Sequence, residues 1–319
     1  MTFQGALRAL AGAALAATLL SANPAAADET LTVGKANPTS FVFALIDVGQ
    51  AAGIFGKHGL TLDISAFGGG PKLQQAMAAG SVDIGMSTGA DMALAAKGAP
   101  VKAVASILNG VDQVIVVSPK SGIASADDLK GKTFAASSPA AASGWLPTVL
   151  ATQKGWGADG VKLQIVNSSA SAMALLETGQ IDAMTIDPAN ALNGEKAGTM
   201  KIVYHYSDLL SKFPQYAFYA TNELAQKRPD ALKGFLAAWL ETVKYAKANK
   251  DETVKVIQGV IGMDAALVGE VYDKLIGMFS DDGRFDAGSL DVLLSSFVDN
   301  GVLEKKPAVA DVSTDAFLP

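Results

Sequence analysis

The sequence predicts an α/β protein with two similar lobes, and three observations support this prediction. Short apolar strands alternate with helices between residues 30 and 221, as in βαβ units that build mostly parallel sheets. A strand followed by a polar corner at 78–91 recurs at 176–190. From Asn222 to Asn300 the pattern indicates helices alone, so a helical segment is appended to the two lobes.

The first series of elements ends in a long apolar run. Its members are predicted as a strand at 30–36, a helix from Phe41 to Lys57, a strand at 60–67, a helix at 72–79 and a strand at 82–86. Glycine-rich corners such as 68–70 separate them, as expected for short turns between βαβ units. Residues 101–118 are predicted as nearly continuous strand, broken at Asn109-Gly110.

A second series begins after the stretch "ASADDLKGK" at 124–132. Its members are predicted as a strand at 133–136, a helix at 144–154, a strand at 161–166 and a helix at 169–177. An aromatic run at 216–219 is the last segment typical of a strand. Breaks in the C-terminal helices are expected near Asn249, Gly262 and Gly283, because these residues favour turns.

The recurring stretches "AAGSVDIGMSTGAD" and "LETGQIDAMTIDPAN" align without gaps at an offset of 99 residues. This alignment places Gly80 opposite Gly179 and Asp83 opposite Asp182. We interpret the pair as one strand-to-helix unit in each lobe. Ligands of open α/β sheets bind at the carboxyl ends of strands. The corners Thr88-Gly89 and Asp187-Pro188 are therefore expected to face a common cleft.

The N-terminus predicts export. Arg8, an apolar run at 9–20 and the small residues Ala25-Ala26-Ala27 form the pattern of a secretory signal peptide over residues 1–27. The apolar run is too short for a membrane span. The chain has no cysteine, so we expect neither disulfides nor a lipid anchor, and we expect a free protein in a periplasm.

The composition restricts the partners. Without the signal peptide the chain has 24 basic and 31 acidic residues, and it shows no basic patch. A net acidic protein binds nucleic acids and anionic membranes poorly. We therefore expect a small-molecule solute as the partner, and a monomer.

Small polar residues at several helix entries are the candidate binding groups. Backbone N–H groups at a helix start attract anions, although Ser, Thr, Asp and Gly are also ordinary N-caps. Phe41 is a candidate aromatic wall beside one of these corners. The predicted binding residues are Thr39, Ser40, Phe41, Gly68, Gly69, Ser87, Thr88, Gly89, Ser137, Ser138, Ser143 and Asp187.

The expected ligand is a small organic anion such as a sulfonate, and a solute with an amine is the alternative. The only arginines are Arg8, Arg228 and Arg284, so the corners lack a guanidinium clamp, and an anion would be held by amides and hydroxyls. A sulfonate suits such a cradle better than a dicarboxylate. Asp187 is either a receptor for an amine or a plain N-cap before Pro188, and both roles are compatible.

No catalytic or metal motif stands out. The two histidines, His58 and His205, have no nucleophile motif beside them. The chain lacks a G-x-S-x-G elbow, an H-E-x-x-H motif and any Cys/His metal spacing. We therefore expect no enzyme activity, no metal and no cofactor.

Several stretches resemble a known family, the solute-binding proteins of bacterial ABC importers for nitrate, sulfonates, taurine and thiamine precursors. The resemblance lies in "AAGIFGKHGLTLDI", "GGGPKLQQAMAAGSVDIGM", "KGAPVKAVASI", "VVSPKSGIASADDLKGKTFA" and "LETGQIDAMTIDP". The resemblance departs at Ile186, because sulfonate-type members often have an aromatic residue before this Asp-Pro.

The resemblance implies a two-lobed periplasmic-binding-protein fold of type II, with two hinge crossings and the C-terminal helices on lobe 1. It implies lobe 1 at 28–117 and 218–319, and lobe 2 at 118–217. It also implies that the loaded protein delivers its solute to an ABC permease in the inner membrane. The alternatives are a ligand-sensing module and a thiamine-precursor enzyme on the same fold. The missing cysteine and the predicted signal peptide argue against the enzyme.

Overall fold

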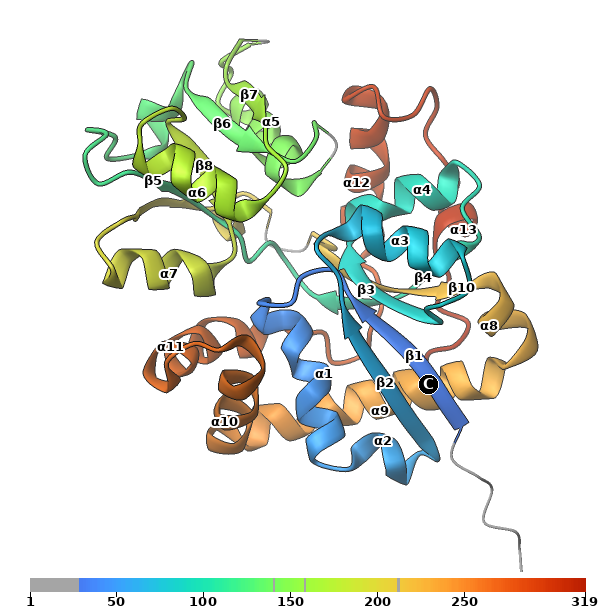
Figure 1. Cartoon of the computed structure of the whole chain (residues 1–319). Coiled ribbons are helices and arrows are strands. Elements are labelled where there is room, and N and C mark those ends of the chain that lie inside the picture. Colours follow the sequence, from blue (N-terminus) through green and yellow to red (C-terminus); the bar gives the residue numbers. More distant parts are fainter. Residues whose placement is uncertain (1–28, 140, 158, 211–212) are drawn as a thin grey trace, which may run out of the picture.

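The computed structural model describes residues 29–139, 141–157, 159–210 and 213–319. The predicted signal peptide lies outside the described residues. The described chain is built on two five-stranded sheets with helices around each of them, and the sheets lie in separate parts of the molecule (Figure 1). We call the part around the first sheet lobe 1 and the part around the second sheet lobe 2.

The first sheet has the strand order β2-β1-β3-β10-β4. Its strands are β1 (Glu29–Lys35), β2 (Leu60–Ala66), β3 (Ile84–Thr88), β4 (Val101–Leu108) and β10 (Tyr216–Thr221). β1 is parallel to both β2 and β3, whereas β10 runs antiparallel to β3 and β4.

The second sheet has the order β7-β6-β8-β5-β9. Its strands are β5 (Val114–Val117), β6 (Thr133–Ala136), β7 (Lys162–Ile165), β8 (Ala183–Ile186) and β9 (Lys201–His205). β6 is parallel to β7 and β8, and β5 is antiparallel to β8 and β9. The two sheets thus repeat one plan, with a single antiparallel strand between parallel neighbours.

Helices cover both sheets. The helices of the two lobes are α1 (Phe41–Ala51), α2 (Ile54–Lys57), α3 (Gly70–Ala78), α4 (Met92–Ala96), α5 (Ala142–Gln153), α6 (Ser169–Glu177) and α7 (Pro188–Lys196). The sequence predicted one helix from Phe41 to Lys57, but Gly53 has a φ of 67° and separates α1 from α2.

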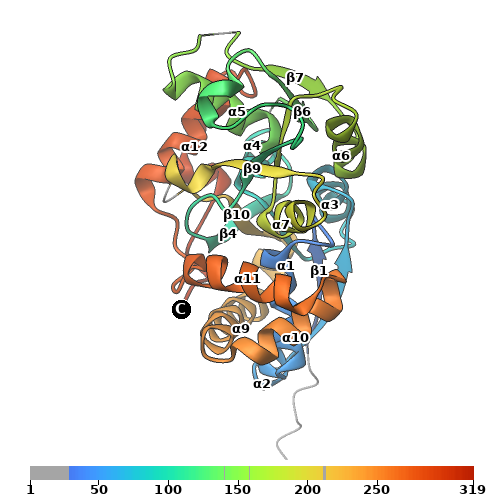
Figure 2. The same cartoon turned by 90° about the vertical axis from the view of Figure 1, so that its left-hand side faces the viewer.

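The C-terminal part is helical, as predicted. It contains α8 (Asn222–Lys227), α9 (Pro229–Ala248), α10 (Lys250–Ile261), α11 (Ala265–Leu275), α12 (Ala287–Asp299) and α13 (Val309–Val312). α9 and α10 pack on α1 of lobe 1, which confirms the expected position of these helices. α11 also contacts α7 of lobe 2, and both views show the two helices side by side (Figures 1 and 2).

The chain passes between the sheets twice, at 109–113 and between β9 and β10, where the structure describes residues 206–210 and 213–215. The two passages are hydrogen-bonded to each other, since the N–H of Gly110 donates to the carbonyl of Phe213 at 3.0 Å. The first passage comes earlier than the expected boundary after Val117, because Val114–Val117 pairs with β8 and β9 of the second sheet. The second passage also ends earlier than expected, because Tyr216 and Ala217 already pair with β3.

The repeated Asp of the two sequence stretches has the same structural role in each lobe. Asp83 accepts a hydrogen bond from the N–H of Thr32 at 3.0 Å, and Asp182 accepts one from the N–H of Thr133 at 2.8 Å. Each carboxylate thereby satisfies a backbone donor of the neighbouring parallel strand. Gly80 and Gly179 precede them with φ values of 75° and 73°, which only glycine adopts without strain. The repeat is therefore a structural element, confirmed in both lobes.

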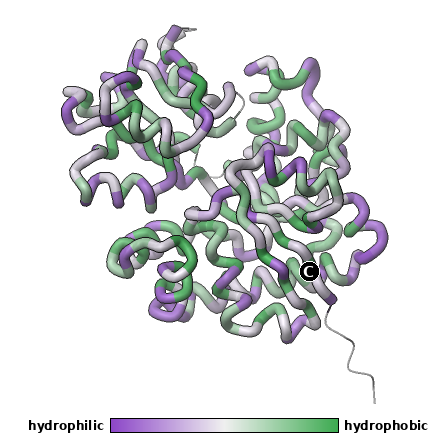
Figure 3. The backbone as a smooth tube through the Cα atoms, in the orientation of Figure 1, coloured by the Kyte–Doolittle hydropathy of each residue, from purple (hydrophilic) through white to green (hydrophobic). Residues whose placement is uncertain are grey.

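Apolar side chains fill the space between each sheet and its helices, and hydrophobic residues follow the strands (Figure 3). β5 alternates between two clusters, because Ile115 and Val117 join the main core while Val114 and Val116 join a smaller core in lobe 2. In the part of the chain that the structure describes, no helix is long and apolar enough to cross a membrane.

Candidate functional site

The carboxyl ends of two parallel strands lie beside the two passages of the chain. β10 starts opposite the end of β3, because Tyr216 pairs with Thr88. β5 starts opposite the end of β8 in the same way, with Val114 paired to Ile186. The corners after β3 and β8, one from each lobe, therefore adjoin one junction between the lobes.

Five polar side chains belong to this junction, and we call them the hinge cluster: Asp112, Gln113, Asp187, Gln215 and Tyr216. The Tyr216 hydroxyl donates to Asp112 Oδ1 at 3.1 Å, and the N–H of Asp112 donates to Gln215 Oε1 at 2.8 Å. The exposed fractions of Asp112, Gln215 and Tyr216 are 6%, 3% and 5%. Buried side chains therefore connect the first passage of the chain to the second.

Burial controls the charge of the hinge cluster. It raises the pKa of Asp112 to about 7, and the nearby negative charge of Asp187 adds to this rise, whereas the polar side chains of Tyr216 and Gln215 oppose it. Burial also raises the pKa of Asp187, against hydrogen bonds from Asn190. Among the described residues, no Lys or Arg forms an ion pair with either carboxyl group. The site is therefore acidic, and its charge changes near neutral pH.

Two amide atoms of the hinge cluster have no hydrogen-bond partner in the described structure. They are Gln113 Oε1 and Gln215 Nε2, and both are buried. The orientation of the Gln215 amide follows from its hydrogen bond, because its oxygen accepts from the N–H of Asp112. Unpaired buried polar atoms cost free energy, so their presence calls for a functional explanation.

Aromatic rings pack against the junction from both lobes. Phe43 of α1 contacts Tyr216 edge to face, with the ring centroids 5.1 Å apart. Trp145 of α5 stacks on Phe213 of the second passage at 4.6 Å. The indole N–H of Trp145 is buried and has no acceptor in the described structure. The junction thus combines acidic and amide groups with apolar walls, as small-molecule sites do.

The corner after β3 contains a second acidic group. The Ser87 hydroxyl and the Gln74 amide both donate to Asp91 Oδ2, the latter at 3.4 Å. Burial raises the pKa of Asp91, and these two hydrogen bonds oppose the rise. A Cβ atom on Gly70 would lie 2.9 Å from Asp91 Oδ2, so the first turn of α3 closes directly over this carboxyl group.

Comparisons with known proteins agree with this architecture. Residues 40–253 match the model of the NMT1/THI5-like family, which is two thirds of the chain. The chain belongs to the NMT1/THI5-like family. A protein of Brucella abortus (strain 2308), named provisionally as a binding protein, is 28% identical over 225 residues, covering 69% of this chain and 68% of its own length.

Solved structures of periplasmic binding proteins have the same fold. The ligand-binding component of an ABC-type import system from Staphylococcus aureus has a TM-score of 0.75 at 16% identity, with 91% of this chain and 97% of that chain covered. The periplasmic aliphatic sulphonate binding protein SsuA of Escherichia coli has a TM-score of 0.71 at 20% identity, with 89% and 91% covered. The desulfurization enzyme DszB also shares the fold, with a TM-score of 0.63 at 16% identity and 91% and 97% covered.

Among the predicted binding residues of this family member, those after β1 have mainly structural roles. Ser40 is the N-cap of α1 and accepts from the N–H of Phe43 at 3.4 Å. Thr39 donates through its N–H and its hydroxyl to Asn37 Oδ1. Phe41 is only 2% exposed and belongs to the main core, so it packs inside lobe 1.

The predicted glycines after β2 shape the entry to α3. Gly69 has a φ of 131°, which strongly favours glycine, and its N–H donates to the carbonyl of Ala36 at 2.9 Å. A Cβ on Gly68 would meet only the flexible side chain of Lys72, at 3.5 Å. These glycines therefore bring the start of α3 close to β1.

The corner after β3 contains three predicted residues with different surroundings. Ser87 is fully buried, and its hydroxyl is occupied by Asp91. Gly89 lies against the second passage, since its N–H donates to the carbonyl of Gln215 at 2.7 Å. Thr88 is partly exposed, and its carbonyl accepts from the Tyr219 hydroxyl at 2.6 Å.

The predicted serines of lobe 2 bond among themselves. The Ser143 hydroxyl accepts from the N–H of Ser137 at 3.1 Å, and the Ser138 hydroxyl accepts from the N–H of Ala141 at 3.1 Å. α5 begins at Ala142 rather than at the predicted Gly144, so Ser143 lies in its first turn. All three serines are at least partly exposed.

Asp187 is the predicted residue that joins the hinge cluster. It is also the N-cap of α7, because Asp187 Oδ1 accepts from the N–H of Asn190 at 3.1 Å. The capping role that the sequence allowed is therefore confirmed. The role in binding stays a prediction, and the proximity of its charge to Asp112 supports it.

Sequence reasoning did not select Asp112, Gln113 or Gln215 as binding residues, and it placed Tyr216 only in the aromatic run of the last strand. These residues come from the two passages, which are about 100 positions apart in the chain. The sequence contains one usable signal: the polar pairs Asp112-Gln113 and Gln215-Tyr216 each adjoin a buried strand. Two adjacent polar residues at the point where the chain passes from one sheet to the other would have indicated the site.

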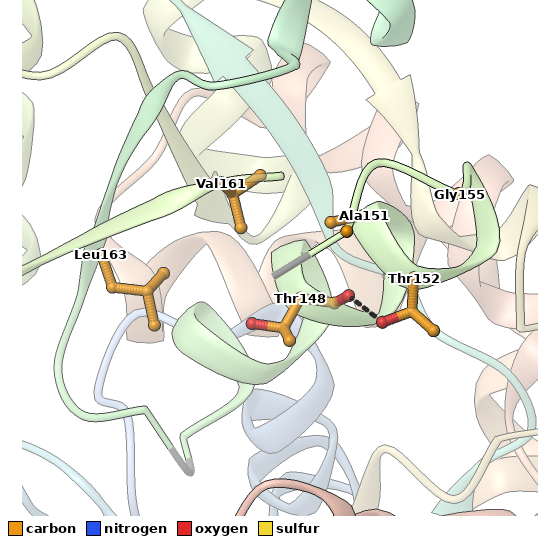
Figure 4. Close-up of a pocket in the computed structure, with 7 residues that line it drawn as sticks. Thr148, Ala151, Thr152, Gly155, Val161 and Leu163 are labelled. Carbon is orange, nitrogen blue, oxygen red and sulfur yellow. Dashed lines mark hydrogen bonds between the residues drawn. The ribbon is translucent and has the colours of Figure 1, made fainter. Parts of the chain in front are cut away.

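Surface hollows of the described residues also lie away from the hinge cluster. One has a volume of about 560 Å³ and lies between α5 and β7, where Thr148, Ala151 and Leu163 line it (Figure 4). The Thr152 hydroxyl at its edge donates to the carbonyl of Thr148 at 2.9 Å, so it is satisfied within the helix. This hollow contains none of the predicted binding residues and lies beside an edge strand.

Two basic residues near the strand ends are already paired. Lys35, at the end of β1, is 5% exposed and contacts Asp47 of α1 at 2.7 Å. Arg228 contacts Glu29 and Asp83 at the opposite ends of the strands. In the described residues, no group of three or more His, Cys, Asp or Glu side chains is arranged to hold a metal ion.

Proposed function

We propose that the protein captures a small solute in the periplasm and delivers it to an ABC permease in the inner membrane. One observation carries this proposal: both passages of the chain and the corners after β3 and β8 meet at one buried polar cluster between the lobes. A solute bound there contacts groups from both lobes and favours their closed arrangement. The closed surface is then the form that a permease recognises.

The family and the fold support this proposal. The Escherichia coli neighbour is named as a periplasmic sulphonate binding protein, and the Staphylococcus aureus neighbour as part of an import system. The predicted signal peptide, the absence of cysteine and the net acidic charge fit a free periplasmic protein. A ligand-sensing module would use the same capture step, with a receptor in place of the permease.

An organic anion such as a sulfonate is the ligand that the sequence favoured. The helix starts at Ser40 and Asp187 support it, because each offers backbone N–H groups. The carboxyl groups of Asp112 and Asp187 oppose it, because an anion beside them is repelled. These arguments point in opposite directions. The proposal that the protein captures a solute therefore does not depend on whether the ligand is an anion.

The fold is also used by an enzyme, DszB, so a catalytic role is the competing hypothesis. No nucleophile and base are paired in the hinge cluster, which holds carboxyl, amide and phenol groups only. We therefore expect any bound solute to be released unchanged.

The test is a binding screen on the mature protein with two readouts. Thermal-shift and calorimetric titrations cover cations, anions and neutral solutes, and small-angle scattering measures lobe closure. A solute at 100 times its dissociation constant should stabilise the protein by about 2.7 kcal/mol, decrease the radius of gyration and be recovered intact. Conversion of the solute would overturn the proposal in favour of an enzyme, and a tight ligand without lobe closure would contradict the capture mechanism.

A further inference from the structure

We propose that the hinge cluster receives a positively charged N–H donor group of the solute, such as an ammonium, amidinium or guanidinium group, between Asp112 and Asp187. This inference rests on the proposed function and specifies its ligand class. It departs from the anionic ligand that the sequence favoured.

The hydrogen-bonding inventory of the cluster carries the first step. Ionised carboxylates only accept hydrogen bonds. Asp112 Oδ2 accepts no hydrogen bond in the described structure, and Gln113 Oε1 is a buried acceptor without a donor. The Asp187 oxygens accept from the N–H and the side-chain amide of Asn190, and the backbone N–H groups of Asp187 and Ala189 also interact with them, whereas a carboxylate offers about four acceptor positions. The cluster therefore has more free acceptor positions than free donors, and a group with several N–H bonds fills these acceptors.

The buried amide of Gln215 indicates that this is a site rather than a chance group of acids. Gln215 is 97% buried, since its exposed fraction is 3%, and its Nε2 has no partner that meets hydrogen-bond geometry. The oxygen of the same amide accepts from the N–H of Asp112 at 2.8 Å, so the amide lies against the cluster. A wholly structural cluster would be expected to satisfy this amide, because leaving it unpaired costs free energy.

Charge balance carries the second step. Asp112 and Asp187 repel each other, and no Lys or Arg of the described chain neutralises them. Buried carboxylates are normally paired with a cation, because desolvation of an unpaired charge is costly. A cationic solute removes this repulsion only when it is bound, and this difference favours the loaded state.

Aromatic rings fit the remainder of such a solute. The Tyr216 ring contacts Phe43 of lobe 1, and Trp145 of lobe 2 stacks on Phe213 next to the cluster. Aromatic faces attract cations and also pack on planar apolar groups. A compact organic cation with a planar or short apolar body therefore suits the junction better than a bare metal ion, for which the described residues offer no group of three ligands.

The pH dependence distinguishes a cation from an anion. The titratable groups that face Asp112 are Asp187, from the corner after β8, and Tyr216, from β10. A cation binds the ionised form of Asp112, so its affinity should fall about tenfold for each pH unit below 7. An anion binds best when Asp112 is protonated, and its affinity should rise over the same range.

The experiment uses four ligands of nearly equal shape: benzamidine as the cation, benzamide as the neutral form, and benzoate and benzenesulfonate as anions. Agmatine serves as a non-aromatic cation. Binding is measured by calorimetry at pH 5.5, 7.0 and 8.0. We expect at least one of the two cations to bind, with about fifteenfold weaker affinity at pH 5.5 than at pH 7.0, and the anions to bind weakly or not at all.

Two variants keep the test independent of folding. Asn at position 187 still caps a helix, and Asn at position 112 still accepts from Tyr216 through its amide oxygen. Asp187→Asn and Asp112→Asn should each weaken cation binding by about tenfold or more, and Asp112→Asn should abolish most of the pH dependence. Asp230→Asn, at an exposed position of α9, is the charge-matched control and should change neither the affinity for cations nor its pH dependence.

The outcomes separate this inference from the proposed function. Tight binding of an anion whose affinity rises at low pH would overturn the cationic ligand and leave solute capture intact. Binding of benzamidine that survives both variants would also overturn it. Failure of every charge class to bind, in a protein that unfolds cooperatively, would overturn solute capture itself.

Discussion

The corners after β3 and β8 occupy equivalent places in the two lobes, yet they differ in chemistry. Both follow the same glycine turn and the same Asp that satisfies the neighbouring strand. After the strand, lobe 1 continues with Ser87-Thr88-Gly89 and a short helix, whereas lobe 2 continues with Asp187-Pro188 and the longer α7. The repeat therefore conserves the scaffold up to the end of the strand, and the two corners have diverged beyond it.

This divergence assigns different tasks to the lobes. The lobe 1 corner is closed by packing, because Ser87 and Gln74 both donate to Asp91 Oδ2, the first turn of α3 lies over this carboxyl group, and Gly89 packs against the second passage. The lobe 2 corner leaves part of the Asp187 carboxylate available beside Asp112. In the proposed capture of a solute, we therefore expect lobe 1 to supply a closed wall and lobe 2 to supply a carboxyl group that contacts the solute.

The largest expected effect is on folding stability. It should differ between Gly89 and Pro188, which occupies the equivalent position after β8. A Cβ on Gly89 would lie 2.1 Å from the carbonyl oxygen of Pro214, so the backbone of the second passage must move. Gly89→Ala should lower the free energy of unfolding by about 2–4 kcal/mol, measured by urea denaturation. Pro188→Ala should cost less than about 1 kcal/mol, because the first helical turn tolerates either residue. Equal costs would contradict the packing difference between the corners.

The next effect concerns the ionisation of Asp112 between the corners. Its folded pKa of about 7 lies above the ordinary value of 3.8, so the stabilisation from the protonated form is complete below the ordinary value and is lost as the pH rises through 7. The substitution Asp112→Asn removes this pH-dependent loss of stability. The variant should be more stable than the wild type by on the order of 2–4 kcal/mol at pH 8, and the gain should shrink towards pH 4.

Urea denaturation across this pH range measures the effect. Asp91→Asn is the matched control in lobe 1, since burial also raises the pKa of Asp91. The gain in stability of Asp91→Asn at pH 8 should be smaller than that of Asp112→Asn, because the substitution weakens the hydrogen bonds that Ser87 and Gln74 donate to the carboxylate. A flat pH profile for the wild-type protein would show that Asp112 is not buried as a neutral acid.

A third effect compares the repeated acids themselves. Asp83 accepts from Thr32 through both N–H and hydroxyl and contacts Arg228, whereas Asp182 accepts from Thr133 and lies 3.8 Å from Lys132. Asp83→Ala should therefore cost about 2–3 kcal/mol and Asp182→Ala about 1–2 kcal/mol. Thermal unfolding of the two variants shows which of them loses more stability. A larger loss for Asp182→Ala would contradict this prediction.

Sequence reasoning reached the scaffold because its signals are local. The turn at Gly80, its copy at Gly179 and the helix end at Gly262 all have the positive φ that glycine favours. The change of sheet within 101–118 was not placed correctly, because the apolar residues of β4 and β5 look alike and only their distant partners differ.

The site was harder to predict than the scaffold for the same reason. Asp187 was found because its corner repeats a pattern seen earlier in the chain. Asp112 and Gln215 were not found, because the contact between them spans 103 positions and no local pattern indicates it. Ser87 was selected as a free hydroxyl, although Asp91 lies only four residues later and satisfies it.

The smallest expected effect is on lobe closure. It concerns α4 and α7, the helices that follow the two corners. α4 packs against α13 within lobe 1, whereas α7 reaches across to α11, and Lys196 of α7 contacts Glu270 of α11 at 2.8 Å. Both side chains are about half exposed, so the pair should contribute only about 0.2–1 kcal/mol, and less at high salt. Because it joins the two lobes, its loss should act on closure rather than on folding.

A double-mutant cycle with Lys196→Ala and Glu270→Ala separates these two possibilities. We expect the melting temperature to be nearly unchanged and the radius of gyration of the unliganded protein to increase. Ligand affinity should fall by about two- to fivefold, because a coupling of this size shifts the closed population by that factor. Lys227→Ala, which breaks the ion pair with Glu223 inside α8, is the matched control and should leave closure unchanged. If the control weakened binding equally, the effect would be one of general charge, and the contact between α7 and α11 would have no special part in closure.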